Sequence, residues 1–313
     1  MAHYLVTGGC GFIGSHLCQT LIAQGHQVTI IDNLSTGSLR NAARGSRLFA
    51  VDLLDAEAVR EAMLYMDGVF HLAAAPSAEE DGQAWIRTHA ANQTATVTVL
   101  ETARRCGGIP VVYASSAAVY GDNDGLPLAE SGRLRPRTAC GADKLGSELH
   151  ARVAQTVHGI RTVGFRLFDV YGPREDPTLP SSGLIAAFAD RLTRGEPITL
   201  PGDGLQVRDF VHVGDVVRFL IAGMASRNTE ARVYNVCTGR PTKVLHLVRT
   251  MAELLGTTAD LRFAPPSDSE IRCLLGDPSR AAAELHTTAR TDLNTGLAST
   301  LGVNPILELA GAA

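Results

Sequence analysis

Three glycines near the N-terminus stand at a spacing that suits the binding of a phosphate group. Gly8, Gly11 and Gly14 lie between an apolar run, Tyr4 to Thr7, and a stretch with helical character. The first glycine permits a tight turn, the second lets a ligand approach the backbone, and the third lets the helix pack closely on the strand. The helix N-terminus would attract a pyrophosphate. The spacing therefore predicts a dinucleotide-binding loop.

An acidic residue follows the second apolar run, where such a loop requires one. Gln27 to Ile31 is predicted to be a strand, and Asp32 comes directly after it. A carboxylate at this place can accept hydrogen bonds from both hydroxyls of an adenosine ribose, and it would repel a 2′-phosphate. The neighbouring Asn33 and Leu34 supply no arginine to offset that repulsion. These residues favour NAD over NADP as the cofactor.

Further residues of the expected cofactor site follow the third and fourth predicted strands. The carboxyl ends of parallel strands meet at one edge of the sheet, so these residues should contact the adenine and the ribose-diphosphate linkage. The complete set expected to line the cofactor site is Gly8, Gly11, Phe12, Ile13, Gly14, Asp32, Asn33, Asp52, Leu53, Leu72, Ala73 and Ala74.

The elements that must position these residues alternate regularly through the first 165 residues. The expected strands are Tyr4 to Thr7, Gln27 to Ile31, Arg47 to Val51, Gly68 to Leu72, Ile109 to Ala114 and Arg161 to Leu167. The expected helices between them lie near 14 to 24, 55 to 64, 86 to 105 and 141 to 158. This order predicts right-handed crossovers and an α/β fold, a Rossmann-type doubly wound parallel sheet.

After Leu167 the pattern changes to Pro- and Gly-rich loops interleaved with helices. The loops are expected at Tyr171 to Gly183, Gly195 to Gly204 and Ala264 to Ser269, and the helices near 183 to 194, 214 to 225, 243 to 255 and 291 to 301. We interpret this part as a smaller C-terminal substrate-binding lobe. The expected division assigns residues 1–167, with a returning segment at about 210–236, to the NAD-binding domain, and 168–209 and 237–313 to the lobe.

The composition excludes several classes of protein. The 313 residues are 45% hydrophobic and 19% charged, with a net charge of −4, which is typical of a chain with a substantial core. No basic cluster points to nucleic acid, and no apolar run approaches the ~18 residues of a membrane span. The six cysteines form no C-x-x-C pair and the ten histidines show no metal-site spacing. In the absence of a signal peptide, we expect a cytoplasmic protein.

Six motifs occur in an order that extends over essentially the whole chain. They are Gly8-Gly9-x-Gly11-Phe12-Ile13-Gly14, Asp32-Asn33, His71-Leu72-Ala73-Ala74, Ser115-Ser116-Ala117-Ala118-Val119-Tyr120-Gly121, Arg166-x-Phe168-x-Val170-Tyr171-Gly172-Pro173 and Arg208-Asp209-Phe210-Val211-His212-Val213-x-Asp215. Together they resemble the extended short-chain dehydrogenase/reductases, within them the NAD-dependent nucleotide-sugar epimerase/dehydratase family, and most of all the UDP-sugar 4-epimerases. The resemblance implies that the lobe holds a nucleotide-diphosphate sugar, for which a UDP-hexose is favoured, and that Phe168 contacts the cofactor.

The catalytic segment of this family is only partly present. By resemblance, such enzymes oxidise the sugar 4-hydroxyl with tightly held NAD, let the 4-keto sugar turn over, and return the hydride to its other face. They use a serine or threonine and a Tyr-x-x-x-Lys pair, whose lysine also binds the nicotinamide ribose. Ser116 and Lys144 fit the serine and the lysine. The tyrosine position holds Cys140, and no Tyr-x-x-x-Lys occurs anywhere in the chain.

Two interpretations of Cys140 remain open. A thiol has a reference pKa of about 8.5 against about 10 for tyrosine, and Lys144 should lower it further. Because the thiol is shorter than a phenol, it would act directly or through a water that fills the gap. Alternatively, Cys140 is a small residue in the wall of a pocket that has lost its activity. Tyr120 is expected to be a packing residue rather than a displaced base.

The resemblance implies that Ser116, Asp169, Arg208 and Arg272 bind substrate. Asp169 stands where the family has asparagine, and an ionised carboxylate can only accept hydrogen bonds. It would weaken contact with a diphosphate, act as an alternative base, or be an ordinary surface-loop aspartate. Arg208 and Arg272 resemble the two arginines that clamp the diphosphate, and each could instead form a surface ion pair.

The leading hypothesis is an NAD-dependent epimerase that oxidises and re-reduces C4 of a nucleotide-diphosphate sugar, with its proton chemistry rearranged around Cys140. The alternative is a catalytically silent protein that binds NAD and a nucleotide sugar. The 4,6-dehydratases and the decarboxylating relatives are discounted because Ala117 and Ala118 replace their acidic residues. The resemblance also implies a homodimer in which helices 86 to 105 and 141 to 158 form the interface.

Overall fold

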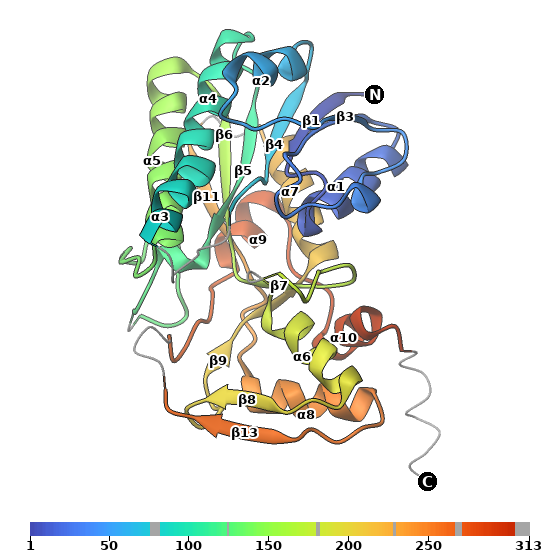
Figure 1. Cartoon of the computed structure of the whole chain (residues 1–313). Helices are drawn as coiled ribbons and strands as arrows, with labels where there is room; N and C mark the ends of the chain where they lie inside the picture. The colour runs from blue at the N-terminus through green and yellow to red at the C-terminus, as the bar shows by residue number, and fades with distance from the viewer. Residues whose placement is uncertain (76–81, 124, 180–181, 228–229, 267–270, 304–313) are drawn as a thin grey trace.

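The computed structural model describes residues 1–75, 82–123, 125–179, 182–227, 230–266 and 271–303. Its centre is a parallel sheet of seven strands in the order β11-β6-β5-β4-β1-β2-β3 (Figure 1). The strands are β1 (His3–Thr7), β2 (Gln27–Ile31), β3 (Arg47–Phe49), β4 (Gly68–His71), β5 (Val111–Ser116), β6 (Thr162–Leu167) and β11 (Arg232–Val236). The predicted α/β fold with a Rossmann-type sheet is therefore confirmed.

Helices cover both faces of this sheet (Figure 1). They are α1 (Phe12–Ala23), α2 (Ala56–Met63), α3 (Gly82–His89), α4 (Ala95–Arg105), α5 (Ala139–His158) and α7 (Val213–Ala225). Successive side chains of a strand point to opposite faces, so Leu5 packs into the core under α2, α4 and α5, and Val6 into the core under α1 and α7. Both cores are buried, which explains the nearly continuous apolar runs of the strands.

The smaller lobe lies at the carboxyl ends of the sheet strands (Figure 1). Its helices and strands are α6 (Leu184–Arg194), β8 (Ile198–Pro201), β9 (Val207–Arg208), β12 (Thr242–Lys243), α8 (Val244–Leu254), β13 (Leu261–Ala264) and α10 (Leu293–Leu301). The short strands β7 (Asp169–Tyr171) and β10 (Phe210–His212) pair where the chain passes between sheet and lobe, and α9 (Ser279–Leu285) packs near β11. The lobe has its own apolar core around Phe188, Leu247 and Met251.

One local prediction was wrong. The segment Gly195 to Gly204 was expected to be a loop, but it contains β8, which pairs with β13 more than sixty residues later. Such pairing is invisible locally because each strand is short and its partner is distant. The helix expected at 86 to 105 is present, and a π-helical turn, Ala90–Thr94, joins its two α-helical parts, α3 and α4.

The π-helical turn has a structural role beside the sheet edge. It places the buried side chain of Asn92 so that its Oδ1 accepts from the N–H of Ala75 at 2.8 Å and its Nδ2 donates to the carbonyl of Ala75 at 3.2 Å. These two bonds fix the segment that follows β4. Such π-helical turns are frequent near functional sites, so the region around Ala75 is a candidate for a functional site.

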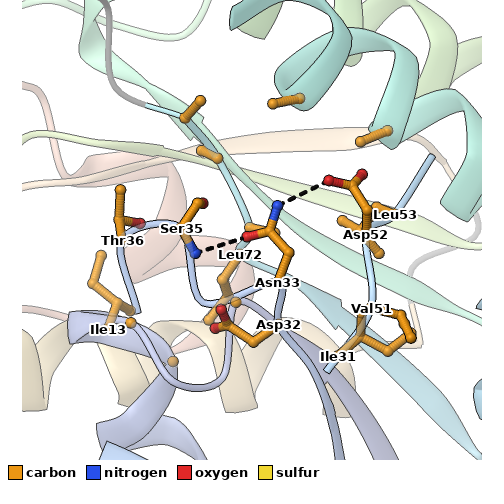
Figure 2. A pocket seen from close by; sticks show the side chains of 18 of the residues that line it. Ile13, Ile31, Asp32, Asn33, Ser35, Thr36, Val51, Asp52, Leu53 and Leu72 are labelled. Carbon is orange, nitrogen blue, oxygen red and sulfur yellow. Dashed lines mark hydrogen bonds between the residues drawn. The ribbon is translucent and has the colours of Figure 1, made fainter. Parts of the chain in front are cut away.

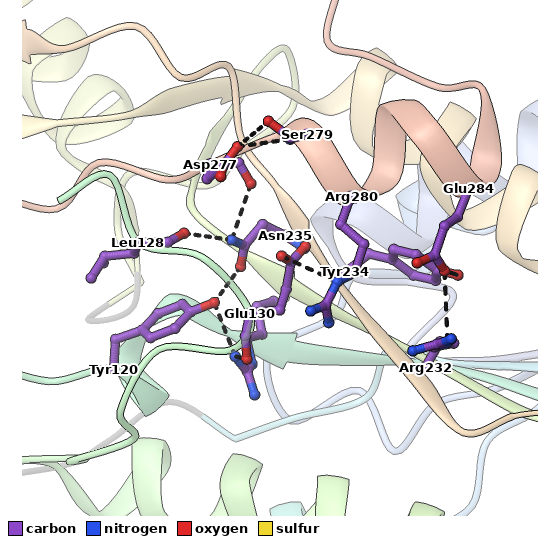
Figure 3. Close-up of polar contacts among 11 residues, drawn as sticks. Tyr120, Leu128, Glu130, Arg232, Tyr234, Asn235, Asp277, Ser279, Arg280 and Glu284 are labelled. Carbon is purple, nitrogen blue, oxygen red and sulfur yellow. Dashed lines mark hydrogen bonds and ion pairs between the residues drawn. The ribbon is translucent and has the colours of Figure 1, made fainter. Parts of the chain in front are cut away.

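A buried polar network ties β5, α5, β6 and β11 together behind this edge. Arg166 on β6 forms a two-pronged ion pair with Glu148 on α5, at 2.9 and 2.7 Å. Its Nη1 also donates to the hydroxyl of Tyr120, which in turn donates to Asn235 at 2.7 Å. Figure 3 shows how Asn235 continues the network to the carbonyl of Leu128. Tyr120 is thus a buried structural residue, as expected, and burial raises its pKa to about 12.

Candidate active site

The turn between β1 and α1 needs glycine at two positions. Gly8 has a φ of +68°, and a Cβ added there would lie 2.8 Å from the backbone of Ala73. A Cβ on Gly14 would overlap the carbonyl oxygen of Gly8. The turn is closed by a hydrogen bond from the N–H of Gly11 to that carbonyl at 3.1 Å. Since Gly11 caps α1 without a side chain, the N-terminus of α1 stays open to an anion.

A cavity of about 300 Å³ opens above this turn. It is lined by all the residues that the sequence predicts for the cofactor from the loop and the strand ends: Gly8, Gly11, Phe12, Ile13, Gly14, Asp32, Asn33, Asp52, Leu53, Leu72, Ala73 and Ala74. The lining also includes Ser35, Thr36 and Ala91, which the sequence analysis missed because no motif or strand end marks them. The glycine turn and the residues from the strand ends fit the pyrophosphate and adenosine of NAD.

Two carboxylates stand at one rim of this cavity. Asp32 is buried, and its oxygens accept from the N–H groups of Cys10 and Leu34, each at 2.9 Å. Figure 2 shows the rim, where Asn33 donates to Asp52 at 2.9 Å. Among the described residues that line the cavity, Asp32 and Asp52 are the charged ones and neither lysine nor arginine occurs. This rim fits a ribose that carries free hydroxyls rather than a phosphate.

Replacing Asp32 should change the choice of cofactor. Each oxygen of Asp32 accepts one backbone bond and keeps a lone pair for a ribose hydroxyl. Charge-assisted hydrogen bonds contribute about 1.5 to 3 kcal/mol, so we expect Asp32→Ala to weaken NAD binding about tenfold or more and to improve NADP relative to NAD. Calorimetry with both cofactors measures this. Glu57→Gln, at an exposed carboxyl on α2 outside the cavity, is the control. An unchanged preference in Asp32→Ala would contradict the assignment.

A second cavity of about 410 Å³ continues from the first toward the lobe. The two cavities share Phe12, Ile13, Thr36, Leu72, Ala74 and Ala75. The sequence-predicted residues Ser116, Cys140, Lys144, Phe168 and Asp169 all line the second cavity. The structure therefore brings together residues up to 53 positions apart in the chain, from β5, from α5 and from the connection between β6 and β7 with the start of β7.

Ser116 ends β5 at the junction between the sheet and this second cavity. Its Oγ accepts from the N–H of Ala118 at 3.1 Å and so caps the short turn Ala117–Val119. The hydroxyl keeps its own proton for donation. Ser116 therefore fixes its turn and can still donate to a ligand in the cavity.

Lys144 lies in the first half of α5 and lines the same cavity as Ser116. The helix begins after Thr138, whose Oγ1 accepts from the N–H of Gly141 at 3.1 Å. The Lys144 ammonium is buried, donates to the carbonyl of Ala114 at 2.9 Å, and has its pKa lowered by burial. Two of its three N–H groups remain for other acceptors.

Cys140 lies one helical turn before Lys144 and on the same face of α5. The thiol is half-buried in the cavity wall. Burial raises its pKa, and the lowering by the Lys144 charge does not compensate. The expectation that the lysine makes this thiol more acidic than a free cysteine is therefore wrong, because the pocket disfavours the thiolate more than one buried ammonium favours it.

The cavity also contains a tyrosine, but not one suited to act as a base. Tyr171 at the end of β7 lines the second cavity and is buried to 1% exposure. Burial raises its pKa, and the carboxylates of Asp215 and Asp292 raise it further. Its phenol is therefore harder to ionise than a free tyrosine.

Asp169 is not an ordinary surface-loop aspartate. It begins β7, pairs with Phe210 and lines the second cavity. Its Oδ2 is buried and has no hydrogen-bond partner within the described part of the chain. Burial raises its pKa to about 6; the Arg208 charge lowers it and the Asp209 charge raises it. The surface interpretation failed because β7 exists only through its pairing with β10.

A second carboxyl in this cavity was missed by the sequence analysis. Glu175 lies in the segment before α6, and its Oε1 accepts from the N–H of Gly183 at 2.7 Å. Burial raises its pKa to about 7; the Gly183 bond lowers it and the Asp169 charge raises it. No spacing in the sequence marks this residue, since it lies in a stretch expected to be a loop.

The two arginines expected at the diphosphate do not line either cavity. The Nη1 of Arg208 donates to the carbonyls of Val207 and Ile271, at 2.9 and 2.8 Å. Arg272 is more than half exposed and forms a two-pronged ion pair with Asp203, at 2.7 and 2.9 Å. Arg272 thus forms a surface ion pair, which was the alternative interpretation from the sequence. Arg208 instead has backbone carbonyls as partners.

The described residues contain no group of three or more histidine, cysteine, aspartate and glutamate side chains that could hold a metal ion. Within the same residues, no helix is long and apolar enough to cross a membrane.

The fold and these cavities define a class of protein. A Rossmann-type sheet with a glycine turn after β1 binds a dinucleotide, and a contiguous cavity toward the lobe holds a second ligand beside the reactive end of that cofactor. Ser116 and Lys144 both line the second cavity. This is the arrangement of a dinucleotide-dependent oxidoreductase.

Comparison with known proteins makes this class more specific. The model of the NAD dependent epimerase/dehydratase family matches residues 4–237, and the chain belongs to this family. The UDP-glucose 4-epimerase of Mycolicibacterium smegmatis is 32% identical over 305 residues, covering 95% of this chain and 96% of that protein.

Two solved structures are similar over almost their whole length. The UDP-glucose 4-epimerase of Thermotoga maritima, solved with UDP-glucose, has a TM-score of 0.91 and 31% identity, with 96% of this chain and 97% of that one covered. The UDP-glucose 4-epimerase of Thermus thermophilus, solved with NAD, has a TM-score of 0.88 and 31% identity, with 99% and 100% covered. The family is NAD-dependent, in agreement with the cofactor expected from Asp32.

Proposed function

We propose that this protein is an NAD-dependent UDP-sugar 4-epimerase whose proton transfer differs from that of a Tyr-x-x-x-Lys enzyme. The observation that carries the proposal is the continuity of the two cavities, with Ser116 and Lys144 on the wall that a reacting sugar would face. The family and the similar 4-epimerases support it.

The residues that line the second cavity have separate roles in this reaction. Bound NAD would accept a hydride from the sugar carbon and return it. Lys144 keeps two N–H groups for the hydroxyls of the nicotinamide ribose, and its position against Ala114 fixes it there. Ser116 donates its free proton to the reacting sugar oxygen and orients it. Phe168, which is buried in the cavity wall, excludes water from the same region.

The proton that the sugar hydroxyl loses would pass to the thiolate of Cys140, which becomes a thiol. The thiol is shorter than a phenol by an aromatic ring, so a water in the space beside it would connect the hydroxyl with the thiol. Burial makes the thiolate scarce near neutral pH, which limits this route. The same observation favours the second candidate function, a protein that binds NAD and a nucleotide sugar without turnover.

One experiment separates the two candidates. Purified protein is given UDP-glucose or UDP-N-acetylglucosamine, while NADH absorbance and the configuration of the product sugar are followed. We expect slow formation of the C4 epimer. Binding of NAD and UDP-sugar without any hydride exchange would contradict the epimerase and establish the silent binder.

We also propose that the protein is a homodimer through α4 and α5. The outer faces of these helices expose Val97, Leu149, Val153 and Val157, and the three residues on α5 recur every four positions on one side. A cytoplasmic location stays a prediction.

The dimer can be tested by placing a charge on this face. We expect Val153→Glu to weaken self-association by about 2 kcal/mol or more, because the glutamate would be buried without a partner. Sedimentation measurements across a concentration series show the change. Phe263→Glu, at an equally exposed apolar residue on β13 in the lobe, is the matched control. A wild-type protein that sediments as a monomer at all concentrations would refute the dimer.

A further inference from the structure

The lobe side of the second cavity has a wall with two carboxyl groups. Asp169 reaches it from β7, and Glu175 from the segment before α6. Glu175 is fixed in place because its Oε1 accepts from the N–H of Gly183 at the N-terminus of α6. The other oxygens, Asp169 Oδ2 and Glu175 Oε2, are buried without a hydrogen-bond partner among the described residues. Both carboxyls therefore keep acceptor capacity for a ligand.

The positive charges near this wall do not neutralise it. Lys144 is the one cationic residue found in the described lining of the cavity, and it lies on α5, bonded to Ala114. Behind Asp169, the charge of Arg208 lowers its pKa, but that guanidinium already donates to two backbone carbonyls. The adjacent Asp209 raises the pKa of Asp169. The wall is therefore acidic overall.

The ionisation of this wall depends on pH near neutrality. Burial raises the pKa of Asp169 to about 6 and that of Glu175 to about 7, and the Asp169 charge adds to the second effect. Both groups are negative above those values and become neutral as the pH falls through them. Cys140 and Tyr171, the other titratable groups of the lining besides Lys144, have raised pKa values and stay neutral over the same range.

Such a wall discriminates between sugars by charge. A sugar hydroxyl can donate to an ionised carboxylate, whereas a sugar carboxylate can only accept and would meet like charges in a partly desolvated space. We propose that Asp169 and Glu175 restrict the pocket to nucleotide sugars with an uncharged ring, and exclude nucleotide-linked uronic acids. The inference rests on the proposed function, since it assumes that the sugar of a nucleotide sugar occupies this cavity.

The test compares two probes that differ only at C6 of the sugar, UDP-glucose and UDP-glucuronate. Because both carry the same UDP, any repulsion of the diphosphate cancels in the ratio of their dissociation constants. We expect the NAD-loaded protein at pH 8.5 to bind UDP-glucose at least about tenfold more tightly than UDP-glucuronate. At pH 5.5 the ratio should fall toward one, since Asp169 and Glu175 are then largely neutral while the glucuronate remains ionised.

Isosteric variants assign the effect to the two carboxyls. The double change Asp169→Asn and Glu175→Gln should abolish the discrimination at pH 8.5 without the need for acid. Glu196→Gln, an exposed carboxyl just beyond α6, is the matched control and should leave the ratio unchanged. Equal melting temperatures of all variants show that the pocket is folded.

The outcomes separate the inference from the proposed function. Equal binding of both probes by the wild type at pH 8.5, or discrimination that persists in the double variant, would overturn the inference alone. Failure to bind either probe at any pH would overturn the proposed function, and this inference with it.

Discussion

Cys140→Tyr is expected to raise the epimerase activity about 100-fold or more. The change restores a phenol one helical turn before Lys144, on the face of α5 that lines the second cavity. A buried ammonium next to the phenol would lower its pKa, and the ring would span the distance that the thiol leaves open. General acid-base groups contribute about 10²- to 10⁴-fold to such rates. Initial rates of C4 epimer formation from UDP-glucose measure the effect.

Two further substitutions at the same position serve as controls. Cys140→Phe fills the space of the ring without an ionisable group, so it should not raise the activity. If the thiol takes part directly or through water, Cys140→Ala should lower the wild-type rate about 100-fold. A wild-type rate that survives Cys140→Ala would exclude the thiol. The remaining candidate bases in the cavity would then be the carboxyls of Asp169, with a pKa of about 6, and Glu175, with a pKa of about 7.

Cys140→Phe and Cys140→Tyr could instead raise the activity equally. That result would show that the aromatic ring acts by filling the pocket, and it would contradict the proton-transfer explanation. If none of the four proteins exchanges hydride although each binds NAD and UDP-glucose, the silent binder is the correct description. The set therefore distinguishes a site that has changed its proton chemistry from one that has lost it.

Glu148→Ala should destabilise the fold by about 3 to 5 kcal/mol. Glu148 and Arg166 are both buried, and their carboxylate and guanidinium meet at 2.7 and 2.9 Å. Removal of the carboxylate leaves the guanidinium buried without its counter-charge, and it also removes the acceptor of the Ser115 hydroxyl. Chemical denaturation followed by circular dichroism measures the change in the free energy of unfolding.

An exposed ion pair provides the comparison. Glu57 and Arg60 on α2 meet at 3.0 Å, three residues apart, and both side chains are largely in solvent. Glu57→Ala should therefore cost less than about 1 kcal/mol. If both substitutions cost the same, burial of the network around Arg166 does not contribute to stability in the way described.

The cofactor site was predictable from the sequence because its determinants are local. The turn between β1 and α1 needs glycine at Gly8 and Gly14 for steric reasons that act within a few residues, and Asp32 directly follows its strand. Apolar runs buried on both faces identified the first six strands of the sheet, since such runs are typical of parallel sheets. Lys144 and Ser116 were found because they keep the spacing of a known family.

The substrate side was decided by the tertiary structure. β8 forms only by pairing with β13, and β7 only by pairing with β10, so no local pattern marks them. The pairing of β7 moves Asp169 from an expected surface loop into a cavity wall, where burial raises its pKa.

The pKa values and the positions of the side chains in the second cavity likewise depend on the residues that the fold places around them. The sequence shows that Cys140 and Lys144 are one turn apart, which alone suggests an acidic thiol, whereas the fold buries the thiol enough to reverse the direction of the pKa shift. Glu175 carries no signal in the sequence and enters the site because Gly183 holds its carboxylate. The sequence by itself determined the fold class, the cofactor and the missing tyrosine, because each rests on residue identity at short spacing. Only the tertiary structure decided the acidity of the pocket, because desolvation and the field of distant charges arise when the chain is folded.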